Sequence, residues 1–284
     1  MQNLIIGASG FIGNSIYSSL KGRETIGTYF SRQKEEMMYL DMSSEHHVNE
    51  MFKKLKPKMV FLPAFIPGVD YCELNKEACK INKIGVKNIV EASKTYQSKL
   101  IFFSSDYIFD GKSGPYLETD QPNPINVYGK TKIECEDFVR SLDNYLIIRT
   151  TVVYGYDRES KNFLMTFTED LQEGKEKKIP IDQFGSPTYV EDLIKITIDL
   201  VKNGKLGIYN VVGPDYCSRY VFALKIARMF GLNEKLIFPT TTKELNQPAK
   251  RPLKAGLIID KIRKEINAKP MSIDESLNLL KDKI

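Results

Sequence analysis

The glycine-rich segment GASGFIG, at residues 7–13, constrains the fold of this chain more than any other feature. It directly follows the apolar run NLII and opens a stretch with apolar residues at helical spacing. Glycines placed between a strand and a helix form a tight turn, let a pyrophosphate approach the backbone, and leave helix N–H groups for phosphates. A glycine turn that only packs the helix against the strand is the alternative. The segment predicts dinucleotide contacts at Gly7, Gly10, Phe11, Ile12 and Gly13.

Strand-like apolar segments alternate with helix-like segments over the first half of the chain. Continuous apolar strands separated by helices indicate a parallel sheet that is covered on both faces. The sequence therefore predicts an α/β fold with a doubly wound parallel sheet, the Rossmann arrangement. The expected strands lie at 3–9, 24–30, 37–41, 59–64, 99–105 and 144–155, and the expected helices at 11–22, 45–57, 77–96 and 126–142.

The end of the second expected strand bears on which dinucleotide binds. An NAD site usually has an acidic residue there for the adenosine ribose, whereas an NADP site accommodates a basic residue. The segment IGTYFSRQ has no acid and ends with Ser31 and Arg32. Arg32 could pair with a 2′-phosphate through its planar guanidinium, or it could be an ordinary exposed loop arginine. We expect NADPH as the cofactor, with NADH as the alternative.

The regular alternation weakens after about residue 154. A helix at 188–204 followed by a strand at 206–213 is expected to return to the main sheet, whereas the tail at 251–266 and 272–284 looks helical. The sequence thus predicts an NADP-binding Rossmann domain of residues 1–153 plus about 186–213. Residues 154–185 and 214–284 would form a smaller, mixed α/β substrate-binding cap, with a cleft between the two parts.

Composition excludes several other classes of protein. The chain has 284 residues, 27% of them charged, and a net charge of +5 whose lysines and glutamates are interspersed. Without a basic stripe interleaved with aromatics, we expect no nucleic-acid partner, although the positive bias could attract an anionic small molecule. The N-terminus does not resemble a signal peptide, and no apolar stretch approaches the ~20 residues that span a bilayer. The expected location is the cytoplasm, with no membrane association.

Cysteine and histidine positions give no metal-site pattern. Cys72, Cys79, Cys135 and Cys217 contain no Cys-x-x-Cys pair. The two histidines, His46 and His47, are adjacent in a polar helical stretch, which favours a surface position. We therefore expect no bound metal.

A tyrosine and a lysine four residues apart occur twice in the chain, as Tyr128 with Lys132 and as Tyr17 with Lys21. With 15 tyrosines in a lysine-rich chain, such a pair arises easily by chance. On a helix the two side chains share one face, and an ammonium beside a phenol lowers the phenol pKa, which suits acid–base chemistry. A serine or threonine should complete such a site by hydrogen-bonding the reacting carbonyl.

Position separates the two copies of this pair. The expected strand at 99–105 ends in Ser104 and Ser105, shortly before Tyr128, whereas no strand-end serine precedes Tyr17. We therefore interpret Tyr17 as an ordinary helix residue and Tyr128 as a candidate catalytic acid.

The segment SSDYIFDGKSGPYLETDQPNPINVYGKTKIECE, at residues 104–136, resembles the dTDP-4-dehydrorhamnose reductase family of extended short-chain dehydrogenases/reductases. Members share the strand-end Ser-(Ser/Thr)-Asp-Tyr-x-Phe-Asp-Gly run and Asn-x-Tyr-Gly-Lys-Thr-Lys. Later segments agree, so the resemblance covers nearly the whole chain. They are NF at 162–163, DQFGSPTYVEDL at 182–193, NVVG at 210–213 and RP at 251–252.

The resemblance implies a role for each matching residue. Members of the family reduce the 4-keto group of a deoxysugar attached to a nucleoside diphosphate, with hydride from NADPH and a proton from the tyrosine. Catalysis would fall to Ser105, Tyr128 and Lys132. The implied contacts are Asp106, Tyr107, Val152, Asn162 and Arg251 with the substrate, Asp41 and Met42 with the adenine, and Ala64 and Phe65 with the ribose side of the cofactor, where Tyr128 and Lys132 would also bind.

Two departures from the family pattern concern the substrate and the cofactor loop. Members commonly have Arg-Thr-Ser-Trp-Val-Tyr-Gly at the last sheet strand, whereas this chain has RTTVVYG, with Val152 in place of tryptophan. The glycine loop of the family often continues Gly-Gln-Leu-Gly, whereas GFIG is the broader superfamily form. The nucleotide and the sugar therefore stay open.

Three functions remain as hypotheses. The leading one is an NADPH-dependent reductase of a nucleotide-linked 4-ketosugar that supplies activated deoxysugar for surface polysaccharide. A nucleotide-sugar epimerase or dehydratase with tightly held NAD is a second. The third is a catalytically silent, NADP-binding regulatory subunit similar to the beta subunit of methionine adenosyltransferase. A homodimer is a further expectation.

Overall fold

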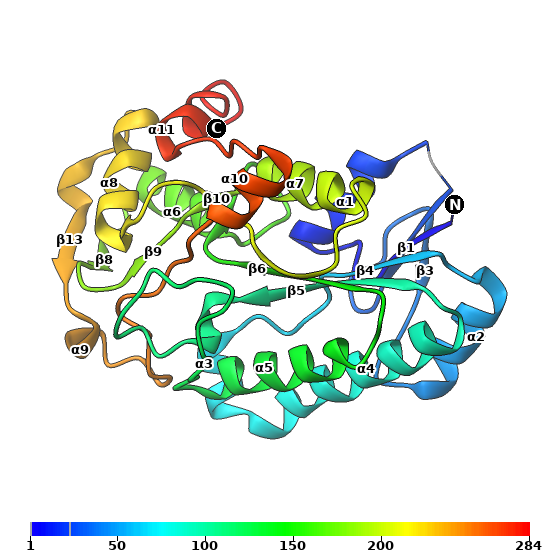
Figure 1. Cartoon of the computed structure of the whole chain (residues 1–284). Helices are drawn as coiled ribbons and strands as arrows, with labels where there is room; N and C mark the ends of the chain where they lie inside the picture. The colour runs from blue at the N-terminus through cyan, green and yellow to red at the C-terminus, as the bar shows by residue number, and fades with distance from the viewer. Residues whose placement is uncertain (1, 23) are drawn as a thin grey trace.

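A seven-stranded parallel sheet forms the centre of the computed structural model, which describes residues 2–22 and 24–284 (Figure 1). Its strand order is β11-β6-β5-β4-β1-β2-β3, which confirms the expected doubly wound parallel sheet. The strands are β1 (Asn3–Ile5), β2 (Thr25–Tyr29), β3 (Met37–Tyr39), β4 (Met59–Leu62), β5 (Lys99–Ser105), β6 (Tyr145–Thr150) and β11 (Gly207–Asn210).

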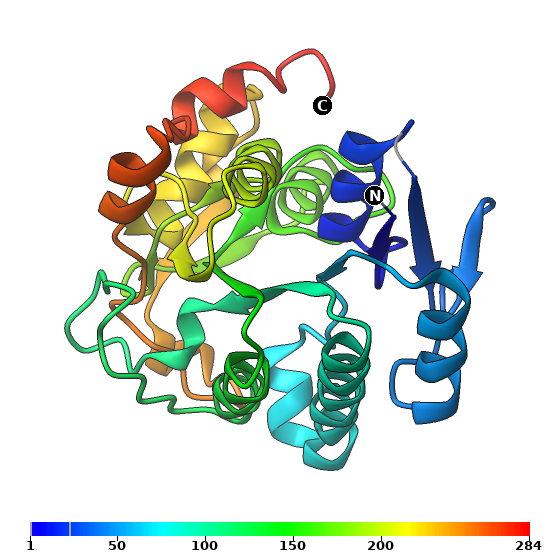
Figure 2. The same ribbon diagram turned by 45° about the vertical axis from the view of Figure 1, so that its right-hand side comes forward.

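Helices cover both faces of this sheet, as Figures 1 and 2 show. One face packs against α1 (Phe11–Leu20) and α7 (Val190–Lys202), which contact each other. The other face packs against α2 (Glu45–Leu55), α4 (Lys76–Thr95) and α5 (Val127–Arg140). Successive strand residues point to opposite faces, so Leu4 and Ile5 belong to two different buried clusters. This double burial explains the continuous apolar strands in the sequence.

The chain reverses its direction of travel across the sheet between β1 and β4. It first builds β1, β2 and β3 outward, then returns to place β4 beside β1 and builds β5, β6 and β11 toward the other edge. In such a sheet a crevice opens beyond the carboxyl ends of the strands at the point of reversal, where ligands bind. The glycine loop after β1 and the segment after β4 meet there.

The expected strand at 144–155 is wrong in its second half. The sheet strand β6 ends at Thr150, and β7 (Val153–Tyr154) pairs instead with β10 (Thr188–Tyr189). Between them, Val152 has a φ of +46°, a left-handed conformation that is strained for a β-branched residue. The left-handed conformation at Val152 turns the chain out of the sheet beside the ligand crevice. The continuous apolar sequence did not predict this turn.

The later part of the chain forms a third buried cluster around Tyr154, Phe167 and Phe222. The segment at 206–213 does return to the main sheet, because β11 pairs with β6, but the helix expected at 251–266 begins only at Asp260. The remaining helices are α3 (Val69–Leu74), α6 (Phe163–Gln172), α8 (Arg219–Met229), α9 (Thr242–Leu245), α10 (Asp260–Ile266) and α11 (Ile273–Asn278), and the remaining strands are β8 (Lys177–Pro180), β9 (Phe184–Gly185), β12 (Cys217–Ser218) and β13 (Ile237–Thr240).

A disulfide joins Cys72 in α3 to Cys79 in the first turns of α4. Both cysteines are buried, whereas Cys135 and Cys217 are free. The two short-range partners face each other because the chain turns between the helices at Asn75, a geometry that the spacing of seven residues did not indicate.

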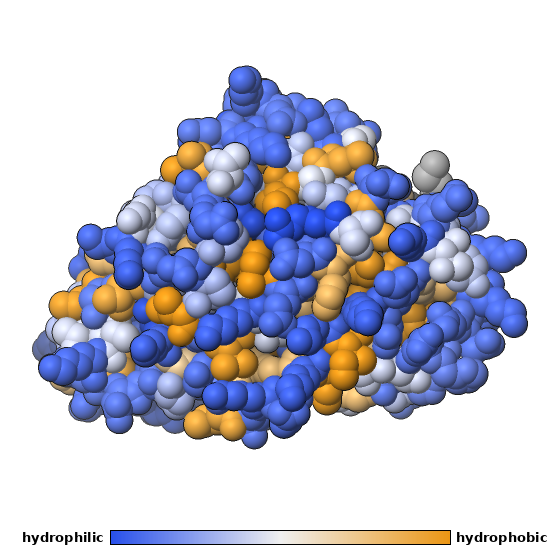
Figure 3. Space-filling model, turned by 60° about the horizontal axis from the view of Figure 1, so that its bottom comes forward, coloured by the Kyte–Doolittle hydropathy of each residue, from blue (hydrophilic) through white to orange (hydrophobic). Residues whose placement is uncertain are grey.

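The surface agrees with the interspersed charges of the sequence. Figure 3 brings forward the side of the molecule that carries α4 and α5, where hydrophilic residues surround separate apolar areas. His46 and His47 are exposed on α2. Among the described helices, none has the length and apolar character needed to cross a membrane.

Candidate active site

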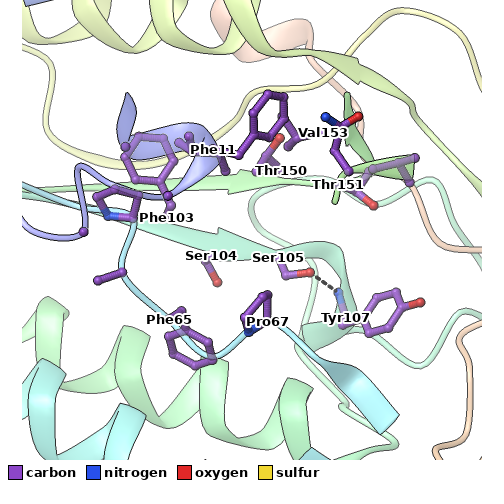
Figure 4. Close-up of a pocket in the computed structure, with 18 of the residues that line it drawn as sticks. Phe11, Phe65, Pro67, Phe103, Ser104, Ser105, Tyr107, Thr150, Thr151 and Val153 are labelled. Atoms are coloured by element: carbon purple, nitrogen blue, oxygen red, sulfur yellow. Dashed lines mark hydrogen bonds between the residues drawn. The ribbon is translucent and has the colours of Figure 1, made fainter. Parts of the chain in front are cut away.

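A cavity of about 570 Å³ lies at the carboxyl ends of β1, β4, β5 and β6. In Figure 4, Ser104 and Ser105 at the end of β5 lie between Phe65 on one side and Thr150 and Thr151 on the other. The lining includes most of the predicted site residues, namely Gly7, Gly10, Phe11, Ile12, Gly13, Arg32, Ala64, Phe65, Ser105, Asp106, Tyr107, Tyr128, Lys132, Val152 and Asn162.

The glycine loop forms a cradle with no room for side chains. A Cβ atom on Gly13 would lie 2.1 Å from the carbonyl oxygen of Gly7, far inside van der Waals contact. Gly10 is the N-cap of α1 and provides no side-chain hydrogen bond to the first turn of that helix. The N–H groups of this turn therefore remain available for phosphate, and the residues present fit a dinucleotide.

Four predicted cofactor contacts divide into two groups. Ala64 and Phe65 line the cavity beside the glycine loop. Asp41 and Met42 do not line it: the Asp41 carboxylate accepts hydrogen bonds from the backbone and hydroxyl of Ser43, and Met42 packs against the inner side of α4. Their contact with adenine therefore stays a prediction.

The loop after β2 contains two of the predicted cofactor-binding residues, and only one of them lines the cavity. Ser31 and Arg32 are both exposed, but only Arg32 lines the cavity. The Nη1 atom of Arg32 donates a hydrogen bond of 3.2 Å to the carbonyl oxygen of Glu159. The cationic group that the sequence predicts for the 2′-phosphate thus lines the cavity.

Close packing brings Tyr128 to the strand-end serine. The Asn126 side chain caps α5 by accepting from the N–H of Gly129 at 2.8 Å. A Cβ atom at Gly129 would lie 2.0 Å from the carbonyl oxygen of Tyr107, so only glycine lets α5 approach the chain after β5 this closely. Ser105 accepts from the N–H of Tyr107 at 3.2 Å, as the dashed line in Figure 4 shows. The predicted trio Ser105, Tyr128 and Lys132 therefore lines one cavity.

Lys132 is buried, with an exposed fraction of 3%. Its Nζ atom donates to the carbonyl oxygen of Phe103 at 2.7 Å and lies 3.5 Å from the ring centroid of Phe65. Burial lowers the pKa of this lysine to about 7, because water no longer solvates the ammonium.

The expectation that Lys132 lowers the pKa of Tyr128 is wrong for this structure. Burial raises the Tyr128 pKa, the Asp106 carboxylate raises it further, and a hydrogen bond with Ser105 lowers it. Lys132 is itself desolvated, and its Nζ atom is 5.8 Å from the Tyr128 ring centroid. The phenol is therefore protonated at neutral pH, and its raised pKa makes it a weaker acid than an exposed tyrosine.

Two cations that the sequence did not mark line the cavity, Lys161 in the segment before α6 and Arg219 at the start of α8. The guanidinium carbon of Arg219 lies 5.8 Å from the ring centroid of Phe163. Burial raises the pKa of the Tyr107 hydroxyl, and the charge of Arg219 opposes that rise. Among the described residues, Arg219 forms no ion pair within 4.0 Å. In the sequence, the NVVG segment at 210–213 lies shortly before this helix, but it did not predict the arginine as a site residue.

Asp106 is almost completely buried beneath this cation. Burial raises the pKa of its carboxyl, whereas hydrogen bonds with Thr151 and Ser105 and the charge of Arg219 lower it. Tyr107 packs edge-on against Tyr128, with ring centroids 6.0 Å apart. The two residues predicted beside the sugar therefore adjoin the candidate proton donor.

The last three predicted substrate contacts have different positions. Val152 and Asn162 line the cavity, although Asn162 also caps α6 by accepting from the N–H of Leu164 at 3.1 Å. Arg251 is not in the cavity lining, because its Nη2 atom is ion-paired with Asp70 of α3 at 2.5 Å. Tyr17, of the second tyrosine–lysine pair, packs beside Gly27 of β2.

Comparison with known proteins assigns the chain to a family. The family model described as RmlD substrate binding domain matches residues 1–284. The chain belongs to the RmlD family. This confirms the resemblance to dTDP-4-dehydrorhamnose reductases. An RmlD-type relative named dTDP-4-dehydrorhamnose reductase, from Aggregatibacter actinomycetemcomitans, is 31% identical over 96% of this chain and 96% of its own.

Two further similarities extend this family assignment. A crystal structure of dTDP-4-dehydrorhamnose reductase from Bacillus anthracis, in complex with NADP, has a TM-score of 0.89 at 29% identity and covers 100% of both chains. The methionine adenosyltransferase 2 subunit beta of Xenopus tropicalis is 28% identical over 92% of this chain and 81% of its own. The relatives of this chain thus include proteins with an enzyme's name and proteins with a subunit's name.

Proposed function

We propose that this protein reduces the 4-keto group of a nucleotide-linked deoxysugar with NADPH, in the biosynthesis of activated sugar for surface polysaccharide. The observation that carries the proposal is the convergence of Ser105, Tyr128 and Lys132 on the cavity that the glycine loop opens. The family match over the whole chain, with relatives named as reductases, supports the same reading.

The residues of the cradle fit the cofactor. Gly7, Gly10 and Gly13 would hold the pyrophosphate, Arg32 the 2′-phosphate, and Lys132 the hydroxyls of the nicotinamide ribose. When bound, NADPH supplies the hydride that reaches the carbonyl carbon of the sugar.

Tyr128 supplies the proton in this scheme. The Tyr128 hydroxyl is protonated at neutral pH, and it can donate to the sugar oxygen because the alkoxide that develops there is more basic than a phenolate. Ser105 hydrogen-bonds the same oxygen and orients the carbonyl. Lys132, with a pKa of about 7, can return a proton toward the phenolate after the step.

Arg219 is the group that we assign to the anionic part of the substrate. It lines the cavity beside Tyr107 and has no carboxylate partner within 4.0 Å among the described residues, so a phosphate oxygen could take that place. Val152 lies on the same wall, where its strained backbone fixes the shape of the sugar site. Arg219 favours a phosphorylated substrate, and valine in place of the family's tryptophan leaves the identity of the sugar open.

The test is a turnover assay with matched variants. The protein is mixed with NADPH and a panel of nucleotide-linked 4-ketosugars, and NADPH absorbance is followed. We expect consumption with one sugar class and a loss of at least about 100-fold in kcat for Tyr128→Phe, which removes the proton donor. Tyr17→Phe is the control and should retain activity. Binding of NADPH without turnover of any ketosugar contradicts the proposal.

A regulatory subunit is the second candidate, because the methionine adenosyltransferase beta subunit matches 92% of this chain. That reading predicts NADPH binding without turnover and co-purification with a partner enzyme. An epimerase or dehydratase instead predicts tightly held NAD, which mass spectrometry of the co-purified nucleotide would detect.

Three broader assignments stay predictions. They are the division into a nucleotide-binding part and a cap, the homodimer, and the cytoplasmic location. The Cys72–Cys79 disulfide bears on the last, because disulfides are rare in a reducing cytosol. Counting free thiols in protein freshly released from cells tests whether this bond forms there.

A further inference from the structure

A segment between β7 and α6, residues 156–162, leads to the edge of the cavity; we call it the strap. It starts after Gly155, where a Cβ atom would lie 3.5 Å from the Phe11 ring at the start of α1. Its last three residues, Ser160, Lys161 and Asn162, line the cavity. The strap therefore borders the cavity with its last three residues.

Glu159 attaches the strap to the loop after β2. Its carbonyl oxygen accepts from Arg32 Nη1 at 3.2 Å, and its carboxylate pairs with Lys34 Nζ at 2.7 Å. These contacts surround a surface hollow that is lined by Arg32, Gln33, Lys34, Glu35 and Glu159. The Glu159 carboxylate thus pairs with Lys34, while its backbone carbonyl binds Arg32 of the same distant loop.

The charge state of Glu159 follows from this placement. A hydrogen bond and the charge of Lys34 lower the pKa of its carboxyl, and the charge of Arg32 lowers it further. Glu159 is therefore ionised at neutral pH, and it occupies the position of an anion beside Lys34 and Arg32.

The loop after the second strand is where a dinucleotide of this fold places its adenosine ribose, and a 2′-phosphate there needs cationic partners. We propose that the Glu159 carboxylate is an internal competitor of the 2′-phosphate of NADPH for Lys34, and so limits the preference of this protein for NADPH over NADH. Lys34 becomes a second phosphate-binding residue, and the strap is released when the phosphate displaces the carboxylate. The inference rests on the NADPH assignment of the proposed function.

A different result is expected if Glu159 and Lys34 form only a surface ion pair that fixes the strap. Loosening the strap would alter access for NADPH and NADH alike, because both share every group except the 2′-phosphate. Competition at the phosphate changes only NADPH. The ratio of the two dissociation constants therefore separates the two explanations.

The experiment measures the Kd of NADPH and of NADH by calorimetry on the full chain, without substrate. For Glu159→Gln we expect the NADPH Kd to fall by roughly 2- to 5-fold, the range of an exposed ion pair, and the NADH Kd to be unchanged. Glu35→Gln is the matched control, because it removes a carboxylate from the same hollow that has no ion pair among the described residues. It should leave both constants unchanged.

A double-mutant cycle identifies the cation. In a Lys34→Gln background, Glu159→Gln should no longer tighten NADPH binding, because the carboxylate has lost the partner that it blocks. The salt dependence gives an independent readout. Wild type exchanges one anion for another, whereas Glu159→Gln gains a new ion pair on binding, so its NADPH Kd should rise more steeply with salt.

Equal shifts of the NADPH and NADH constants in Glu159→Gln, or no shift in either, would overturn the proposal. Wild-type protein that binds neither dinucleotide would overturn it together with the cofactor assignment. If NADPH binds but no ketosugar is reduced, the reductase function fails, and the ratio of dissociation constants still decides the role of Glu159.

Discussion

Replacing Lys132 with methionine should make the protein more stable at neutral pH while it removes a candidate catalytic group. Lys132 is 3% exposed, and its ammonium is balanced by a carbonyl oxygen and the Phe65 ring. Within the part of the chain that the structure describes, no carboxylate lies within ion-pair distance of its Nζ. Such a site costs folding free energy, because the charged amine is removed from water.

The pKa gives the size and sign of this cost. The folded pKa of about 7 lies below the ordinary value of 10.5. The folded state therefore binds fewer protons between these values, and stability that is present above pH 10.5 is lost as the pH falls through about 7. At about 1.4 kcal/mol for each pH unit, the penalty at pH 7 is on the order of 4 kcal/mol. Losing the hydrogen bond and the ring contact offsets roughly 2 kcal/mol, so Lys132→Met should gain about 2 kcal/mol.

Urea unfolding of wild type and Lys132→Met between pH 6.5 and 9.5 measures this gain. The stability difference between them should be largest near pH 7 and shrink by up to about 1.4 kcal/mol for each pH unit above it. Lys130→Met is the control, since Lys130 is exposed on the same helix and should give a flat difference. A Lys132→Met difference that does not change with pH would refute the reasoning.

Three further substitutions test other parts of the site. Gly13→Ala places a Cβ 2.1 Å from the Gly7 oxygen, so we expect NADPH binding to weaken by more than about tenfold and unfolding to require roughly 1–3 kcal/mol less, measured by calorimetry and urea titration. Arg32→Ala should raise the NADPH Kd severalfold without changing the NADH Kd; an unchanged ratio means that Arg32 is only a loop arginine. Arg219→Gln should raise the KM for the nucleotide sugar about tenfold or more and leave the NADPH Kd alone, whereas equal effects on both ligands contradict its assignment to the substrate.

Local patterns in the sequence identified residues that the structure brings together in one cavity. The glycine loop had to follow β1, because only a backbone without side chains fits where Gly13 meets the Gly7 carbonyl. Tyr128 and Ser105 could be placed because both lie at element ends, and the carboxyl ends of parallel strands share one edge of the sheet. These features depend on residues that are close in the sequence, and a sequence motif contains such residues.

The sequence did not predict features that depend on contacts between residues far apart in the chain. The low pKa of Lys132 and the raised pKa of Tyr128 arise from burial, which no residue spacing reveals. The end of β6 at Thr150 is set by the left-handed Val152, although its apolar sequence reads as continuous strand. Arg219 lines the cavity because α8, which follows much later in the sequence, begins close to Tyr107.

The short helix α3 positions two segments near the site. Its Asp70 accepts hydrogen bonds from Arg251 and from the N–H of Ala249, so it holds the segment that contains both residues. Because the Nη1 atom of Arg251 is buried without a hydrogen-bond partner among the described residues, the contact of this arginine with substrate stays a prediction. Glu73 of α3 accepts from the N–H of Val127, one residue before Tyr128, at 2.9 Å. The same helix thus fixes both the segment near the substrate wall and the start of α5. The motif identifies which side chain is present, whereas its position depends on the carboxylate with which it pairs.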